Sequence, residues 1–212
     1  MPTSRAIRIS SDSHSFKEIN QTGLECIGEL DTYSIAEVLM LAVKSLETIS
    51  DDYVLDVSHM GIISALVDAI GLSDAGRAKI LTCVGEKNLH EIDAVCASEN
   101  IDAGAAVTLK KLLSLKGGID EMLEVLNGTD AYGYACEMAE IIKELGSCAE
   151  KVRVDFSVTD DMKYYCGIVF KGFIKGIPTS VLSGGRYDNL LRKMGKKAGA
   201  IGFAVYLDFL NE

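Results

Sequence analysis

The sequence lacks the features that mark several classes of protein. No apolar run approaches the ~20 residues that a membrane-spanning helix needs, and the first ten residues, MPTSRAIRIS, contain no apolar segment typical of a secretory signal. The cysteines are scattered without a C-x-x-C pair, which argues against a zinc site or a disulfide framework. We therefore expect a cytoplasmic protein with reduced thiols, no membrane association, and no metal or other cofactor.

Basic residues are also scarce. The chain has 21 Lys and Arg against 31 Asp and Glu, which gives a formal net charge of −10. A strongly acidic surface is a poor partner for a phosphate backbone, so nucleic-acid binding is not expected. Residues 160–212 are the exception, because they carry eight Lys and Arg against five Asp and Glu. This excess suits either a solvated basic surface or a local site for an anionic small molecule.

The hydrophobic pattern changes its period along the chain. Strand-like residues occur around Ile19–Ile27, and an amphipathic helix follows, for which Ser34 and Glu37 form an S-x-x-E capping box. The alternation over Tyr53–His59 predicts another strand. From about residue 60 to residue 148 the apolar spacing is helical and is interrupted by glycines.

The period then returns to two residues in VRVDFSV, YYCGIVFKGFI, TSVLSGG and AGAIGFAVY, with a turn at Lys175 and Gly176. The last of these runs into a short helix. Strands that come before and after a helical block predict an α+β protein with a mostly antiparallel sheet, flanked by helices and interrupted by a helical insertion at about 60–148.

Two stretches could line a binding site. Gln21 and Glu25 are four residues apart on a predicted strand and therefore point to the same face. A carboxylate with an amide suits an α-ammonium group, although an exposed polar face would have the same pattern. Tyr164 and Tyr165 are adjacent on a predicted strand, so only one of them could turn its phenol into a pocket.

A third stretch, SGGRYDNLL, places paired glycines before a helix. Gly184 and Gly185 would let the backbone approach a ligand or another strand closely. Arg186 could bind a carboxylate or a phosphate through its planar fork. Asp188 could cap the following helix, or Arg186 and Asp188 could simply pair with each other.

The order of these stretches is more specific than any one of them. FKEINQTGLECIG, YYCGIVFKGF, LSGGRYDNLL and AIGFAVYLDFL together resemble the catalytic core of histidyl-tRNA synthetases and of their paralogue, the regulatory subunit of ATP phosphoribosyltransferase. The resemblance implies the class II synthetase fold. It also implies that seven residues belong to a histidine pocket or its wall: Gln21, Glu25, Tyr164, Tyr165, Gly184, Gly185 and Arg186.

The departures from the synthetase pattern argue against catalysis. The synthetase motif R-G-L-D-Y-Y-T-G aligns with DDMKYYCG, so that Asp160 stands at the arginine position and Lys163 at the aspartate position. The motif G-F-A-x-G-x-E-R-L aligns with GFAVYLDFL, where Phe209 replaces the ATP-clamping arginine and Tyr206 fills a small position. RAIRIS resembles the strand of the preceding ATP-binding motif, with Arg8 as its arginine.

The resemblance implies one synthetase-like core over residues 1–212 that lacks the first class II motif and the anticodon-binding domain. We expect a non-catalytic regulatory subunit that assembles with a short ATP phosphoribosyltransferase catalytic subunit in histidine biosynthesis and that senses histidine; the resemblance also allows a homodimer. Two alternatives remain, a fragment of a true histidyl-tRNA synthetase and a free-standing histidine-binding module.

Overall fold

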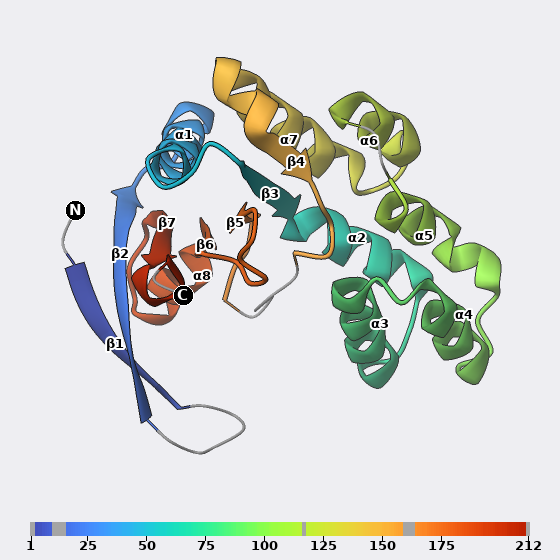
Figure 1. The fold of residues 1–212 in the computed structure, drawn as a ribbon. Helices are drawn as coiled ribbons and strands as arrows, with labels where there is room; N and C mark the ends of the chain where they lie inside the picture. The colour runs from blue at the N-terminus through green and yellow to red at the C-terminus, as the bar shows by residue number, and fades with distance from the viewer. Residues whose placement is uncertain (1–2, 10–15, 116–117, 159–163, 211–212) are drawn as a thin grey trace.

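A computed structural model describes residues 3–9, 16–115, 118–158 and 164–210, with the side chains of residues 3–9, 16–19 and 103 left out of the description. The described residues form a seven-stranded sheet in the order β1-β2-β7-β6-β5-β3-β4 (Figure 1). Its strands are β1 (Thr3–Ile9), β2 (Phe16–Gly28), β3 (Tyr53–His59), β4 (Val152–Val154), β5 (Ile168–Ile174), β6 (Leu182–Arg186) and β7 (Gly199–Tyr206).

All neighbouring strands are antiparallel except β3 and β4, which confirms the prediction of a mostly antiparallel sheet. β1 and β2 form a hairpin in which residues 16–22 of β2 pair with β1, and residues 21–28 of β2 pair with β7. The central strands therefore come from the last third of the chain, with β2 on one side and β3 on the other.

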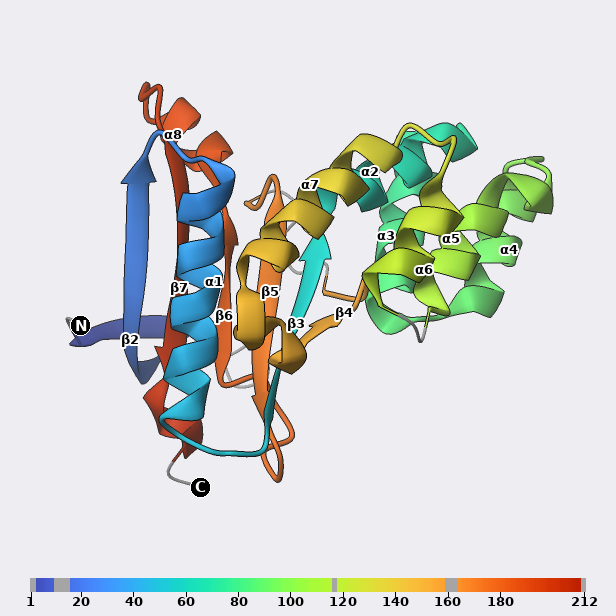
Figure 2. The ribbon, with the colours of Figure 1, turned by 90° about the horizontal axis from the view of Figure 1, so that it is seen from above.

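Helices α1 (Thr32–Glu47) and α7 (Tyr132–Glu144) pack across one face of the sheet (Figure 2). Leu39 and Leu46 of α1 belong to the same buried cluster as Phe170 of β5 and Phe203 of β7. Successive residues of a strand point to opposite faces, so the residues between these apolar ones face away from α1. Glu25, Lys171 and Ser183 lie on that second face.

The short helix η2 (Gly146–Lys151) directly follows α7 and contacts α7, α1 and β3. The remaining helices gather beyond the β3–β4 edge of the sheet (Figure 2). They are α2 (Met60–Ile70), α3 (Asp74–Glu86), α4 (Leu89–Ser98), η1 (Ala103–Ala106), α5 (Val107–Leu113) and α6 (Ile119–Leu126). Their buried residues, such as Ile62, Ile80 and Leu109, join the same core cluster as the sheet. Two short elements follow later in the chain, α8 (Asp188–Lys193) and η3 (Leu207–Leu210).

Three local predictions were wrong. Helix α1 begins at Thr32, because the side chain of Asp31 accepts a hydrogen bond from the Ser34 N–H at 2.7 Å and caps the helix. VRVDFSV forms a strand of only three residues, since the chain turns away at Asp155, whose carboxylate accepts a hydrogen bond from the Ser157 N–H at 2.9 Å. The β5 strand begins at Ile168, so Tyr164 and Tyr165 are not strand residues.

The predicted turn at Lys175 and Gly176 agrees with the structure. The turn near Lys175 contains Gly176 with φ +90°, a left-handed backbone conformation that glycine adopts without steric cost. All six cysteines are free. None of the helices in the described part of the chain combines the length and the apolar character needed to cross a membrane.

Candidate functional site

A cavity of about 280 Å³ opens on the sheet face that points away from α1. Its lining comes from β2, β6 and β7, from the segment that precedes β5, and from Tyr187 between β6 and α8. The lining residues are Gln21, Glu25, Tyr164, Tyr165, Ser183, Tyr187, Gly202, Phe203, Ala204 and Tyr206. Four of the seven residues expected in a histidine pocket therefore lie together in one cavity.

Gln21 and Glu25 occupy the same face of β2, opposite Tyr206 and Gly202 of β7, respectively. The Glu25 carboxylate lies against the α-carbon of Gly202, where a methyl group would lie 2.8 Å from Oε2. Burial of this carboxylate raises the pKa of Glu25 above its ordinary value of 4.5, although more than a third of the residue surface stays exposed. A cationic group of a ligand would find a partly desolvated anion here.

The tyrosines form an aromatic wall. The ring of Tyr164 packs edge-on against Tyr165 at 4.9 Å between centroids and stacks on Tyr187 at 5.3 Å. Both Tyr164 and Tyr165 line the cavity, which contradicts the prediction that only one could face a pocket. That prediction depended on a strand, whereas the two residues lie in an irregular segment where the alternation of faces does not apply.

Gly184 and Gly185 allow protein groups to pack closely. A methyl group at Gly184 would collide with the backbone oxygen of Gly202, and one at Gly185 would lie 2.7 Å from the Tyr165 ring. Gly184 lines a second cavity next to this one, and Gly185 lies against the Tyr165 ring of the aromatic wall. The close approaches are thus to β7 and to Tyr165. Close approach to another strand was one of the two alternatives that the sequence offered.

Arg186 lies outside both cavities. Its guanidinium pairs with Asp188, with Nε to Oδ2 at 2.9 Å, and approaches Glu137 of α7 at 3.7 Å. The alternative in which Arg186 and Asp188 pair is therefore the correct one. Asp188 is the first residue of α8 and makes no cap, because Tyr187 occupies the cap position. The assignment of Arg186 to a histidine site stays a prediction.

Glu137 connects the helices to the end of the sheet. Its carboxylate lies 3.7 Å from Nε2 of the buried His59, at the start of α2, and the same distance from Arg186. The His59 ring stacks on Tyr134 with centroids 5.3 Å apart, and its Nδ1 accepts a hydrogen bond from Gly61 N–H. The neighbouring His59, and to a lesser degree Arg186, hold the pKa of Glu137 below its usual value.

A second cavity, of about 360 Å³, adjoins the first and shares Tyr165, Ser183 and Tyr206 with it. Lys171, Thr179, Ser180 and Phe209 line its far side. Burial lowers the pKa of Lys171. Phe209, expected to replace a synthetase arginine, packs edge-on against Tyr206 with centroids 5.8 Å apart. Asp160 and Lys163 lie outside the described residues, as does the side chain of Arg8.

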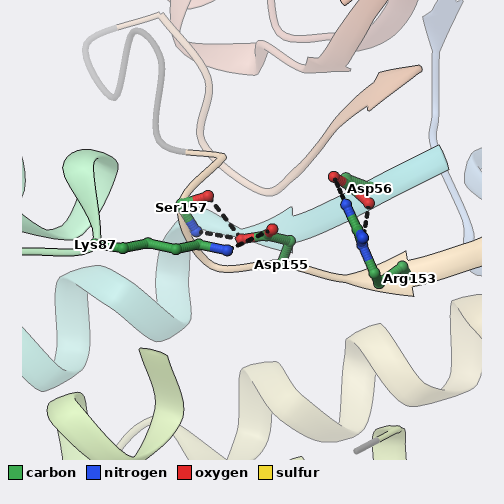
Figure 3. Close-up of polar contacts among 5 residues, drawn as sticks. All are labelled: Asp56, Lys87, Arg153, Asp155 and Ser157. Carbon is green, nitrogen blue, oxygen red and sulfur yellow. Dashed lines mark hydrogen bonds and ion pairs between the residues drawn. The ribbon is translucent and has the colours of Figure 1, made fainter. Parts of the chain in front are cut away.

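The same sheet face continues to the β4 edge, where Asp56 is 3% exposed. Arg153 of β4 donates two hydrogen bonds to it, from Nε and Nη2, each at 2.7 Å (Figure 3). Next to this pair, Lys87 contacts Asp155 at 2.8 Å. The first ion pair attaches β4 to β3, and the second attaches the segment after β4 to the end of α3.

Several cavity residues were not predicted as site residues, namely Ser183, Tyr187, Gly202, Phe203 and Ala204. Period-two spacing could have identified two of them, because Gly202 and Ala204 alternate with core residues along β7, on the face of Tyr206. Among the described residues no three His, Cys, Asp or Glu side chains are grouped to hold a metal ion. The site offers one carboxylate, one amide and several phenols, a set suited to binding a small cationic or zwitterionic molecule.

The chain is similar to known proteins over nearly its full length. The model of the family described as Histidyl-tRNA synthetase matches residues 4–210. An ATP phosphoribosyltransferase regulatory subunit from Caldanaerobacter subterraneus subsp. tengcongensis is 30% identical over 199 residues, which are 91% of this chain and 52% of the relative. The chain spans about half the length of such curated relatives.

Solved structures give the same result. An ATP phosphoribosyltransferase regulatory subunit/histidyl-tRNA synthetase from Bacillus halodurans has a TM-score of 0.83 at 29% identity, over 98% of this chain and 56% of that chain. A Histidine–tRNA ligase subunit from Alicyclobacillus acidocaldarius has a TM-score of 0.78 at 26% identity, over 98% and 66%. The expected class II synthetase-like fold is thus confirmed, and the chain belongs to the histidyl-tRNA synthetase family.

Proposed function

We propose that this chain is the synthetase-like part of a regulatory subunit of ATP phosphoribosyltransferase, which acts in histidine biosynthesis without catalysing a reaction itself. The observation that carries the proposal is its similarity, over about nine-tenths of the chain, to curated relatives with that name. The chain spans about half of each relative, so the activity and the partners of the complete protein are part of this proposal.

The site supports a binding role. Gln21 and Glu25 offer hydrogen-bond acceptors on one face of β2, and an aromatic wall stands beside them. The cavity volume of about 280 Å³ suits a molecule the size of a single amino acid. We propose free histidine as its ligand, with a cationic group at Glu25. On this proposal histidine binding regulates a partner enzyme, a short catalytic subunit of ATP phosphoribosyltransferase.

The proposal also includes a compartment and an architecture. The six free cysteines support a reducing, cytoplasmic environment. The helices between residues 60 and 148 are proposed to be an insertion in a single synthetase-like core. Their buried residues join the core cluster of the sheet, which favours one folded unit over two independent ones.

Coexpression with a short catalytic subunit of ATP phosphoribosyltransferase tests the assembly. We expect the two chains to copurify and the complex to form phosphoribosyl-ATP, with a lower rate when histidine is added. A catalytic subunit that neither copurifies with this chain nor changes its activity would contradict the proposal.

A second candidate is a fragment of a histidyl-tRNA synthetase, favoured by the family model and by the ligase subunit at 26% identity. Tyr206 and Phe209 argue against it, because they place two packed aromatic rings beside the second cavity. Histidine-dependent exchange of pyrophosphate into ATP separates the candidates. We expect no exchange by this chain, whereas a synthetase fragment with an intact site would catalyse it.

A further inference from the structure

Two cavities lie side by side on one sheet face, and three residues form a dividing wall between them, distinct from the aromatic wall. Tyr165, Ser183 and Tyr206 line both the cavity that contains Gln21 and Glu25 and the cavity that contains Lys171. Within this wall, the Tyr206 hydroxyl and the Ser183 Oγ are hydrogen-bonded at 2.6 Å. The Tyr206 ring therefore separates two cavities that would otherwise form one longer cleft.

The strand register explains how the ring reaches across. Ser183 of β6 lies opposite Ala204 of β7, and Tyr206 is two residues further along β7 on the same face. A diagonal neighbour of this kind lies roughly 7–8 Å away, within reach of an aromatic side chain. Ala204, opposite Ser183 on that face, carries only a methyl group.

A second contact holds the ring in place. Phe209, in η3 directly after β7, packs edge-on against Tyr206 with ring centroids 5.8 Å apart. The ring thus has an aromatic neighbour on the η3 side and a hydrogen bond at its hydroxyl. Rotating it out of the wall would break both contacts, so the wall is part of the folded structure.

Charge sets the direction in which a zwitterionic ligand would lie. Glu25 stands opposite Gly202, and Gln21 stands opposite Tyr206, four residues away along the same pair of strands. Since like charges repel, a ligand carboxylate is directed away from Glu25 and toward the neutral amide of Gln21. The carboxyl end of an amino acid in this cavity therefore points toward Tyr206.

We propose that Tyr206 limits the length of the ligand, so that the cavity accepts a free α-amino acid and rejects one extended through its carboxyl group. This inference rests on the proposed histidine site and adds the residue that determines its specificity. A steric barrier against the longer ligand would give selectivity without a new attractive contact.

Calorimetric titration of the full chain with L-histidine and two isomeric dipeptides tests the proposal. His-Gly extends histidine at its carboxyl end, and Gly-His extends it at its amino end. We expect wild-type protein to bind His-Gly at least about tenfold more weakly than histidine, a difference of about 1.4 kcal/mol. Tyr206→Ala should remove most of that difference for His-Gly and leave the affinity for Gly-His, which is extended at the other end, unchanged.

Two further variants keep the test decisive if Tyr206→Ala does not fold. Tyr206→Phe and Ser183→Ala each remove the hydrogen bond and leave the ring, so both should increase His-Gly binding partially. Tyr33→Ala is the matched control, because Tyr33 lies on α1 and is 61% exposed. It should leave all three affinities unchanged.

The outcomes separate this inference from the proposed function. If histidine binds and wild-type protein takes His-Gly equally well, the role of Tyr206 is wrong while the histidine site stands. The same conclusion follows if the folded variants keep the full discrimination against His-Gly. If histidine does not bind to wild-type protein, the proposed ligand and the role of Tyr206 both fail.

Discussion

Arg186 and Asp188 form an ion pair between the end of β6 and the start of α8, and Asp188 also binds the backbone of β7. The guanidinium Nε and Nη2 each lie 2.9 Å from Oδ2 of Asp188. The other carboxylate oxygen accepts a hydrogen bond from the Ala200 N–H at 3.0 Å. Burial alone would raise the pKa of Asp188, but the hydrogen bonds from Arg186 and Ala200 outweigh it and lower the pKa.

Replacing Asp188 by alanine should destabilise the fold by about 3 kcal/mol, because it leaves a buried N–H and a partly buried guanidinium without their shared acceptor. Asp188→Asn keeps one acceptor for Ala200 and should cost less. Urea unfolding monitored by circular dichroism measures both changes. Equal stability of the alanine variant and the wild type would show that the pair does not contribute.

The contact between Glu137 and His59 predicts a pH-dependent contribution to stability. Because the folded-state pKa of Glu137 lies below its ordinary value of 4.5, the ionised carboxylate stabilises the fold. That contribution is complete above pH 4.5 and is lost as the pH falls through the folded-state pKa. Glu137 is 40% exposed, so the contribution should stay below about 1 kcal/mol.

The measurement compares urea midpoints of wild type and Glu137→Gln at pH 7 and at pH 3. We expect the variant to be less stable at pH 7 and the difference to shrink at pH 3. Glu140→Gln, an exposed residue of the same helix, is the control for the loss of one negative charge. A difference of the same size at both pH values would mean that packing, and not charge, is the cause.

The two ion pairs of Figure 3 should differ in their contribution to stability. Arg153→Ala removes the partner of Asp56, a buried carboxylate that then lacks both of its hydrogen bonds, and should cost about 2 kcal/mol. Lys87→Ala removes a side chain that is 51% exposed, and should cost less than about 1 kcal/mol. Thermal unfolding of both variants tests this order, and the reverse order would contradict it.

Periodicity predicted the strands and helices well where one face of an element is buried. Helix α1 and strand β7 are examples, because their apolar residues recur at the spacing of the buried face. It failed at the start of β5, where the apolar pattern continues backward through Tyr165 although the strand begins at Ile168. The intervening Gly167 packs against Arg186, a contact from a distant part of the chain that local spacing cannot contain.

The candidate site was predictable to the extent that it follows strand alternation. Gln21 and Glu25 share a face and line one cavity, as their spacing indicated. Arg186 was assigned to the pocket wall by resemblance, but it pairs with Asp188 and Glu137. The pairing with Asp188, two residues away, was one of the alternatives that the sequence offered, whereas the approach to Glu137 at 3.7 Å depends on the packing of α7, a tertiary contact that the sequence pattern does not encode.

The raised pKa of Glu25 predicts how ligand affinity changes with pH. A cationic group binds the ionised carboxylate, and burial makes that carboxylate hold its proton at a higher pH than an ordinary glutamate does. The affinity for histidine should therefore begin to fall at a pH above 4.5 as the solution is acidified. It should be restored when the pH rises and Glu25 loses its proton.

Titrating histidine into wild-type protein and into Glu25→Gln between pH 5 and 8 separates the contribution of Glu25 from the titration of the histidine imidazole, which occurs near pH 6.5. The variant keeps the size and the acceptor oxygen of the side chain but has no charge, so it should bind about tenfold more weakly at pH 7. Its affinity should follow only the imidazole of the ligand. Identical pH profiles for the two proteins would show that the Glu25 charge does not contact the ligand.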